Sequence, residues 1–260
     1  MFDSPLVVTV TIVAFLVAGL VKGVIGMGLP AVAIALLSLV MTPAQGAALL
    51  VVPSLVSNVW QFLAGPQVFA LLRRLWSMML GICFGVWMGS GLLANDTTGR
   101  ARTALGVVLI LYAALGLANR RFSVSARAEP WLSPLIGIAT GLVSAATGIF
   151  AMPAVPYLQA MALEKEDLVQ ALGLTFTVAT IALGADLMHG GVLQSSLAVP
   201  SLLALGVAIV GMFMGQIIRL RVRSDVFRVC FFAGLLNARS HADHKGRRFR
   251  LIGHICISLA

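Results

Sequence analysis

The feature that most limits how this chain can fold is a series of long stretches without any charged side chain, at residues 6–20, 47–59, 105–118 and 196–218. Runs of about 18 or more apolar residues are typical of transmembrane helices. A bilayer offers no water to the backbone, so spanning segments must be helices or strands of a closed barrel, and continuous apolarity favours helices. Only 10% of the 260 residues are charged, against about 25% in soluble domains. We therefore expect an all-α polytopic membrane protein.

The formal net charge of +9 is the second constraint. Most Lys and Arg residues lie in short connections between apolar stretches, where basic residues mark the cytoplasmic side of a membrane. Such loops offer no surface for reading nucleic acid, so we expect no nucleic-acid partner. The cysteines Cys83, Cys230 and Cys256 have neither disulfide nor metal spacing. We expect no cofactor and no metal, and the sequence does not indicate an oligomeric state.

Two parts of the chain resemble each other. Residues 19–32 read GLVKGVIGMGLPAV, and residues 141–155 read GLVSAATGIFAMPAV. The matched positions are Gly19 with Gly141, Gly26 with Gly148, Pro30 with Pro153, and the hexapeptides FGVWMG at 84–89 with VGMFMG at 210–215. Because the same features recur in order at a nearly constant offset, internal duplication is indicated. We expect a first membrane repeat at 1–119, a cytoplasmic linker at 120–130 and a second membrane repeat at 131–236.

Each repeat divides into about five membrane segments, the second of which is shorter than the ~20 residues that cross a bilayer. The expected segments are 6–28, 30–41, 46–64, 75–94, 103–118, 132–150, 152–162, 168–188, 196–218 and 226 onward. If the short segments cross, the basic connections collect on one face; if they only dip in and return, the basic residues divide between both faces. The bias of basic residues toward the cytoplasm favours crossing, and therefore inverted-topology repeats with the N-terminus outside. Eight membrane segments are the alternative to ten.

The repeat pattern fails at the C-terminus. Residues 226–236 would span only about 16 Å as a helix, against a hydrocarbon core near 30 Å. A basic tail follows at 237–260. Either this segment is short and capped by an interfacial tail, or the C-terminus is frameshifted or truncated. We favour the second interpretation, in which the tail is not native and the last helix is incomplete.

Glycine and proline are concentrated at matching places in the two repeats. These breaks comprise Gly23, Gly26, Gly28 and Pro30 in the first repeat and Gly148 and Pro153 in the second. Irregular backbone at membrane depth is tolerated where protein or a water-filled cavity satisfies it, and paired breaks indicate a transporter site. A helix that restarts after a break presents free N–H groups, which suit an anion. The alternative is that these glycines only permit close helix packing.

Lys22 lies within an apolar run, where a charge costs at least about 2.5–3.5 kcal/mol. Its matched position in the second repeat is Ser144, so the duplicated site would be asymmetric. We predict that Lys22 pairs with a substrate anion or a carboxylate. The alternative is that its ammonium group reaches a nearby interface.

Polar residues of later segments are further candidates for binding the substrate. They are Ser54, Ser57, Asn58 and Gln61 in the first repeat and Gln170, Thr175, Thr177 and Thr180 in the second. Hydroxyl and amide donors suit oxyanions, but hydrogen bonds between helices explain such residues equally well. Asp186 and His189 are a candidate proton relay, for which a place at the membrane interface is the favoured alternative.

These residues carry a family resemblance. The segments AGLVKGVIGMGLPAVAIALLSLVMTPAQGAALLVVPSLVSNVWQ and ATGIFAMPAVPYLQAMALEKEDLVQALGLTFTV resemble the TauE/SafE family of membrane transporters, and the resemblance extends over most of residues 5–236. It implies two inverted half-repeats, a bacterial inner-membrane location, and gradient-driven or facilitated movement of sulfur-containing or carboxylate anions. The family's closing helix is missing after Leu236.

Together, these features predict a secondary transporter, not an enzyme, that exports small anions such as sulfite, sulfonates or related carboxylates. Its expected partners are the lipid bilayer, the anion and a coupling ion, either a proton or sodium. An intramembrane enzyme would need a converging nucleophile and base, and the one intramembrane acid–base pair is Asp186 with His189. A non-transporting membrane assembly factor is the other alternative.

Overall fold

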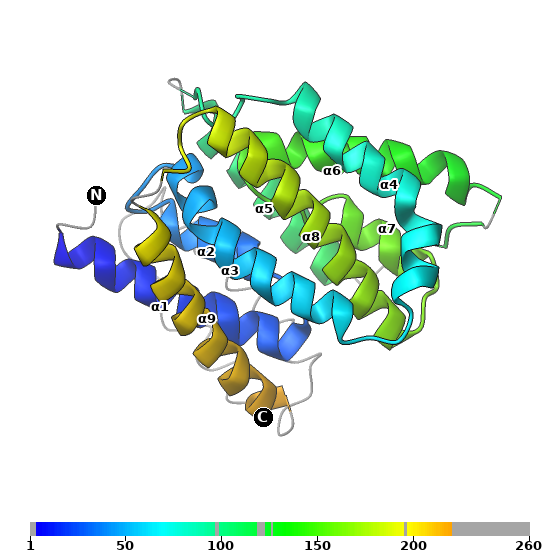
Figure 1. Ribbon diagram of the computed structural model, residues 1–260, viewed down its shortest axis with the longest axis horizontal. Helices are drawn as coiled ribbons and strands as arrows, with labels where there is room; N and C mark the ends of the chain where they lie inside the picture. Colours follow the sequence, from blue (N-terminus) through cyan, green and yellow to red (C-terminus); the bar gives the residue numbers. More distant parts are fainter. Residues whose placement is uncertain (1–3, 97–98, 119–122, 126, 195–196, 220–260) are drawn as a thin grey trace.

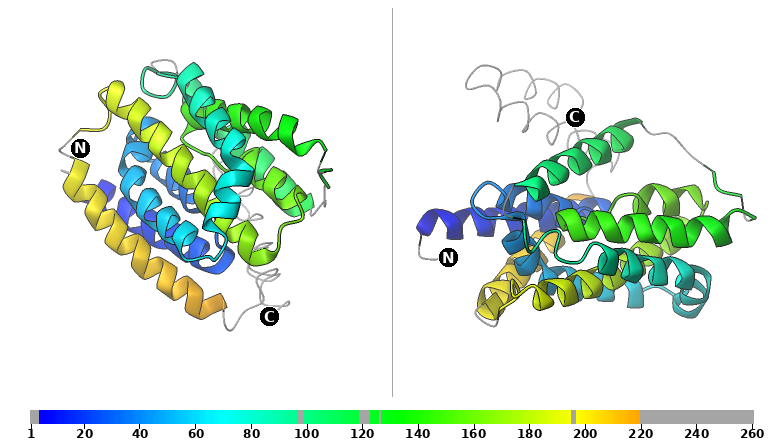
Figure 2. Two further views of the ribbon diagram at one scale, coloured as in Figure 1. Left: turned by 45° about the vertical axis from the view of Figure 1, so that its right-hand side comes forward. Right: turned by 90° about the horizontal axis from the view of Figure 1, so that it is seen from above.

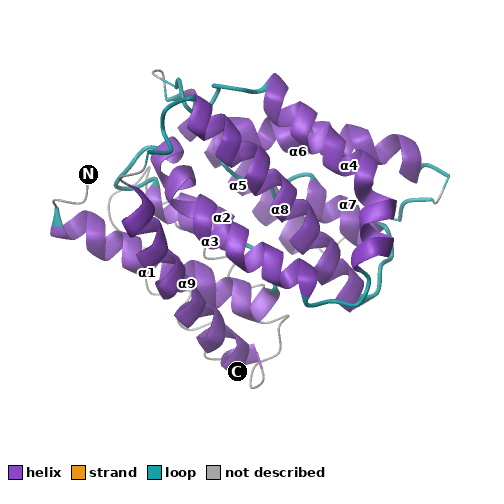
Figure 3. Ribbon diagram, viewed as in Figure 1, coloured by secondary structure: helices purple, strands orange, loops and turns teal. Residues whose placement is uncertain are grey.

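The computed structural model describes residues 4–96, 99–118, 123–125, 127–194 and 197–219 (Figure 1). These residues form helices joined by loops, and no strand occurs among them (Figure 3). The helices are α1 (Pro5–Ile25), α2 (Leu29–Leu37), α3 (Pro43–Leu63), α4 (Val68–Met88), α5 (Arg100–Ala118), α6 (Glu129–Thr147), α7 (Ala154–Ala160), α8 (Lys165–His189) and α9 (Ala198–Arg219).

The expected all-α membrane fold is confirmed. Six helices of the described chain are long and apolar enough to cross a bilayer, namely α1, α3, α4, α6, α8 and α9. The two short segments form α2 and α7, which have 9 and 7 residues and are shorter than we expected. The predicted tenth segment from residue 226 and the tail at 237–260 lie outside the described residues, as does part of the linker.

Local sequence explains where several helices begin and end. Pro43 is the first residue of α3, where a missing N–H costs nothing. Thr42 precedes the same helix, and Gln45 is its third residue. The two form a capping box, in which each side chain accepts a hydrogen bond from the backbone N–H of the other residue. Helices α1 and α6 both end at a glycine with positive φ, 85° at Gly26 and 76° at Gly148. Glycine adopts this left-handed conformation without a Cβ clash, so both helices stop there.

Helix α1 packs closely alongside α9. A Cβ atom at Gly19 would overlap the carbonyl oxygen of Ala208, and one at Gly23 would overlap that of Met212. Both contacts advance in the same direction along the two helices, so α1 and α9 are parallel. Because a side chain at either glycine would force the helices apart, this contact requires small residues.

Helices α4 and α6 make a corresponding contact. A Cβ atom at Gly81 would overlap the carbonyl oxygen of Pro134, and one at Gly85 would overlap that of Ile138. These helices are therefore parallel as well (Figure 1). Each close pair joins the first helix of one expected repeat to the fourth helix of the other.

Helices α3 and α8 pack against each other in the middle of the molecule. Gly173 lies against the backbone at Asn58 and Phe62, whereas Gly184 lies against the side chain of Val51. Residue numbers rise along α8 as they fall along α3, so the two helices are antiparallel. The side chain of Gln61 strengthens this contact by donating to the Val169 carbonyl oxygen at 2.7 Å.

The direction of the remaining helices follows from two turns. The chain reverses between α3 and α4 and again between α8 and α9 (Figures 1 and 2). Helices α1, α3 and α9 therefore run in one direction, and α4, α6 and α8 run in the other. The end of the molecule that holds the C-terminus of α3 also holds the N-termini of α4, α6 and α8.

Candidate functional site

Lys22 lies in the last turn of α1, directly before the first break. Its side chain is only 4% exposed. The ammonium group donates to the hydroxyl of Ser57 at 2.9 Å and to the side-chain oxygen of Asn58, both on α3. Among the described residues no carboxylate forms an ion pair with Lys22. The amino group of Lys22 is therefore buried among neutral acceptors.

Two polar groups near Lys22 have no hydrogen-bond partner in the described part of the chain. They are the hydroxyl of Ser54 and the side-chain NH₂ of Asn58, both fully buried atoms. Ser54 and Asn58 are four residues apart on α3 and share a helical face. We call Lys22, Ser54, Ser57 and Asn58 the Lys22 cluster. It offers a cation and unused N–H and O–H donors, which is the chemistry that binds an anion.

The first break lies next to this cluster. The N–H of Gly26 donates to the Lys22 carbonyl oxygen at 2.7 Å, and Gly28 has φ of 100° immediately before α2. Pro30 is the second residue of α2, so this helix begins beside the end of α1. Gly23, in contrast, packs against α9, as the packing alternative proposes.

The second break is not brought to the Lys22 cluster. Gly148 lies against the side chains of Ile34 and Ala47, and Pro153 leads from the same break into α7. Ala47 is 11 residues before Asn58 on α3, a separation of about 16 Å along the helix. The two breaks therefore lie near opposite ends of the α3–α8 pair.

Two polar candidates of the second repeat form hydrogen bonds to backbone groups. Gln170 donates to the carbonyl oxygens of Phe62 and Gly65 at 2.8 and 3.0 Å, and accepts from the N–H of Gln67 at 3.0 Å. It therefore fixes the turn between α3 and α4. Thr177 donates to the Gly173 carbonyl oxygen of its own helix at 2.7 Å.

Thr175 is buried, and no described residue forms a hydrogen bond with its hydroxyl. It is two residues beyond Gly173, which faces α3. Two residues correspond to a rotation of about 200° around a helix, so Thr175 points away from α3. The structure therefore does not place it in the Lys22 cluster.

The comparison with known families decides which class of protein this arrangement belongs to. The family model described as "Sulfite exporter TauE/SafE" matches residues 11–238. The chain belongs to the TauE/SafE family. Comparisons with curated proteins and with solved structures gave no match. Family membership indicates a membrane transporter of the sulfite exporter type, which agrees with the six apolar helices.

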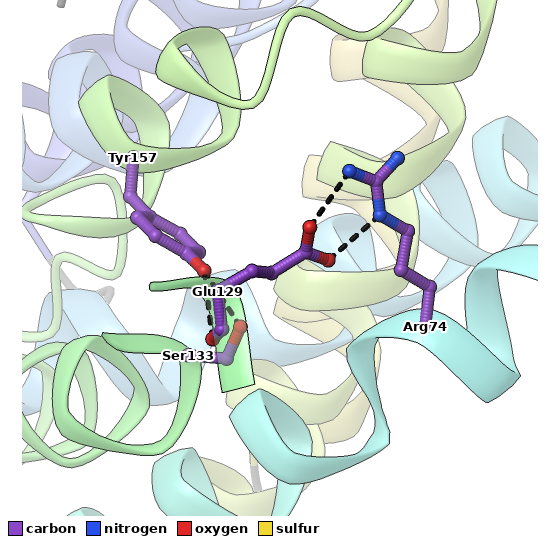
Figure 4. A network of polar contacts seen from close by, with 4 residues as sticks. All are labelled: Arg74, Glu129, Ser133 and Tyr157. Atoms are coloured by element: carbon purple, nitrogen blue, oxygen red, sulfur yellow. Dashed lines mark hydrogen bonds and ion pairs between the residues drawn. The ribbon is translucent and has the colours of Figure 1, made fainter. Parts of the chain in front are cut away.

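This TauE/SafE protein also contains an ion pair between α4 and α6 (Figure 4). The guanidinium group of Arg74 on α4 donates to both carboxylate oxygens of Glu129 on α6, at 2.7 and 2.8 Å. The hydroxyls of Tyr157 on α7 and Ser133 on α6 lie 2.6 Å apart beside it. Together with Trp76, Ser77 and Pro130, three of these residues line a pocket of about 220 Å³.

Sequence reasoning did not find this network. Arg74 and Glu129 are 55 residues apart, and each resembles an ordinary charged residue at a helix start. Ser57, in contrast, was among the polar candidates of the first repeat, and the structure places its hydroxyl against Lys22.

Proposed function

We propose that this protein is a secondary transporter that exports small anions such as sulfite, sulfonates or related carboxylates across the bacterial inner membrane. The observation that carries the proposal is the Lys22 cluster, in which a buried cation has only neutral partners. An ion removed from water loses hydration energy that neutral groups replace incompletely. A bound anion supplies the missing countercharge, and Ser54 and Asn58 supply further donors.

The helix directions support the inverted arrangement of repeats that this function uses. Helix α1 runs opposite to α6, α3 runs opposite to α8, and α4 runs opposite to α9, so these three helices of the first repeat oppose their matched helices in the second. Inverted repeats allow one set of helices to rock against the other and expose a central site to each side in turn.

The positions of basic residues support a cytoplasmic location for one end. Arg73 and Arg74 lie near the start of α4, Lys165 starts α8, and Arg219 ends α9. All four belong to the end that holds the C-terminus of α3. By the bias of basic residues toward the cytoplasm, this end faces the cytoplasm and the second break faces outward. Asn58 is five residues from the end of α3, so the Lys22 cluster lies nearer the cytoplasmic end.

Counterflow of labelled sulfite into liposomes that contain the purified full-length protein tests the proposal. We expect sulfite on the inside to accelerate entry of labelled sulfite, and we expect Lys22→Met to reduce this exchange to the level of empty liposomes. Lys165→Met is the matched control because Lys165 is exposed at the start of α8; it should retain exchange within about twofold, as surface substitutions usually have small effects.

Two results would contradict the proposal in different ways. Exchange by Lys22→Met at the wild-type rate would show that the Lys22 charge does not bind the anion. Absence of exchange by the wild-type protein with sulfite, methanesulfonate and acetate would show that the protein does not transport this class of anion.

A further inference from the structure

A second buried charged group lies at the other end of the α3–α8 pair. Asp186, one turn before the end of α8, is only 8% exposed. One carboxylate oxygen accepts from the hydroxyl of Ser90 at 2.5 Å and from the N–H of Gly91 at 3.2 Å. The other oxygen, Oδ2, is buried and has no hydrogen-bond partner among the described residues. The anion of Asp186 is therefore only half satisfied.

The helices around Asp186 bring no described cation to it. Helix α3 contains no titratable side chain, and the cations of α4 and α9, Arg73 with Arg74 and Arg219, lie at the far end of the molecule. Glu129, the one charged residue of α6, lies at that far end too. His189 is on the same helix as Asp186 but is exposed. On α5, Arg100 is exposed, and Arg102 donates to the Met41 carbonyl oxygen.

Asp186 and the second break lie at nearly the same height along α3. Two residues before it, Gly184 lies against Val51 of α3, and Gly148 lies against Ala47 one turn away on the same helix. The turn after α4 links the two places, because Gly91 binds Asp186 and Leu93 contacts Gly148. The first break thus has a buried cation beside it, and the second break has a buried carboxylate.

We propose that Asp186 is the coupling group of the transport cycle, and that its free Oδ2 takes up a proton from water on the side of the second break and releases it on the other side. This inference rests on the proposed function. Protonation removes a buried charge, and intramembrane carboxyl groups act as proton relays in pumps and transporters. Only the proton moves, and no other bond forms or breaks.

A metal cation fits this place less well than a proton. Hard cations take several oxygen ligands at once. Asp186 has one free oxygen, and no group of three or more His, Cys, Asp or Glu residues that could hold a metal ion occurs in the described part of the chain. We therefore commit to the proton, and sodium becomes an outcome of the test.

The test measures sulfite transport by the full-length protein in liposomes in two ways. Exchange at equal pH on both sides reports substrate movement alone, and accumulation driven by an imposed pH difference reports coupling. Asp186→Asn keeps the shape and the oxygen that accepts from Ser90 and Gly91 but cannot carry a proton. We expect this variant to retain exchange within about threefold and to lose at least tenfold of the pH-driven accumulation.

Two matched variants separate coupling from a structural role. Ser90→Ala removes one hydrogen bond to the same carboxylate without changing its ability to bind a proton, so pH-driven accumulation should persist. Asp186→Glu keeps the titratable group, so it should also restore coupling. If Ser90→Ala lost accumulation to the same degree as Asp186→Asn, or if Asp186→Asn lost both exchange and accumulation, Asp186 would be a structural tie between α8 and the turn after α4.

Two further results would overturn the coupling role. Wild-type accumulation in Asp186→Asn would show that another group carries the proton, and accumulation that follows a sodium gradient but not a pH gradient would show that the coupling ion is not a proton. Absence of wild-type exchange at equal pH is distinguishable from both, because it would refute anion transport itself and the coupling role with it.

Discussion

The two broken segments share a backbone and differ in chemistry. Gly26 and Gly148 both end a helix in the left-handed conformation, and their N–H groups donate to the carbonyl oxygens of Lys22 and Ser144. The side chains then diverge. Lys22 reaches across to two residues of α3, whereas the Ser144 hydroxyl bonds to the Thr140 carbonyl of its own helix at 2.7 Å.

This difference shows that matched packing does not require matched function. The backbone of a break needs only glycines and a neighbouring helix, which both segments possess. The proposed anion site needs a charge and free donors, which only the first break has among its described neighbours. A duplicated fold can therefore carry a binding site at one end and, as we propose, a proton site at the other.

The largest expected effect is a loss of sulfite affinity that occurs on substitution near the first break but not at the second. Asn58→Leu removes a free donor and an acceptor of Lys22, so sulfite affinity should fall about tenfold to a hundredfold, since hydrogen bonds to charged groups contribute about 1.5–3 kcal/mol. Ser144→Ala at the second break should change it by less than about twofold. Concentration dependence of sulfite exchange measures both values. Equal losses in the two variants would show that both breaks bind substrate.

The second prediction concerns the close packing that the helices before the two breaks, α1 and α6, have in common. Gly19→Ala and Gly141→Ala should each lower the free energy of unfolding by about 1–3 kcal/mol, because each new Cβ meets a backbone carbonyl of a facing helix and closely packed interiors tolerate added atoms poorly. Thermal unfolding of the purified variants in detergent measures the losses. A loss in only one variant would mean that the two helix pairs are not equivalent contacts.

A third prediction distinguishes the breaks by their available space. Gly26→Ala should lower the free energy of unfolding by about 1–2 kcal/mol, the cost of a left-handed conformation for a residue with a Cβ. Gly148→Ala should lower it further, because its Cβ would lie 2.8 Å from the Ile34 side chain, whereas that at Gly26 would lie 3.9 Å from Val169. Unfolding temperatures in the reverse order would contradict the packing described at the second break.

The smallest effect is expected at the ion pair between α4 and α6. Arg74 is 41% exposed, and exposed ion pairs contribute about 0–1 kcal/mol. Arg74→Ala should therefore lower the free energy of unfolding by no more than about 1 kcal/mol, and raising the salt concentration should shrink the difference from wild type. A much larger loss would mean that this contact holds the two repeats together.

The sequence predicted the features that arise locally. Continuous apolar stretches gave the long helices, and the Gly-Pro segments gave the two breaks at the correct residues. The two partners of Lys22, Ser57 and Asn58, were both among the polar candidates selected from the sequence, although their contact with Lys22 was not predicted. These inferences succeed because helix periodicity and glycine conformation depend on neighbouring residues.

Relations between distant segments were not predictable in the same way. The positions of Gly148 and Thr175 relative to Lys22 depend on the antiparallel register of α3 and α8, which no local pattern contains. Gln170 looked like a substrate ligand, but its amide group fixes a turn. Polar side chains in a membrane helix donate hydrogen bonds to any carbonyl oxygen within reach. Residue type alone therefore does not distinguish a side chain that binds substrate from one that holds helices together.

The most direct test of the account is the effect of sulfite on the thermal unfolding of the wild-type protein and of Lys22→Met. A ligand that binds only the folded state stabilises it by about 2.7 kcal/mol at a hundredfold excess over its dissociation constant. We predict that sulfite raises the unfolding temperature of the wild-type protein and not that of Lys22→Met, and that the unliganded variant is at least as stable as the wild type because a buried charge has been removed. An equal rise in both proteins would contradict an anion site at Lys22.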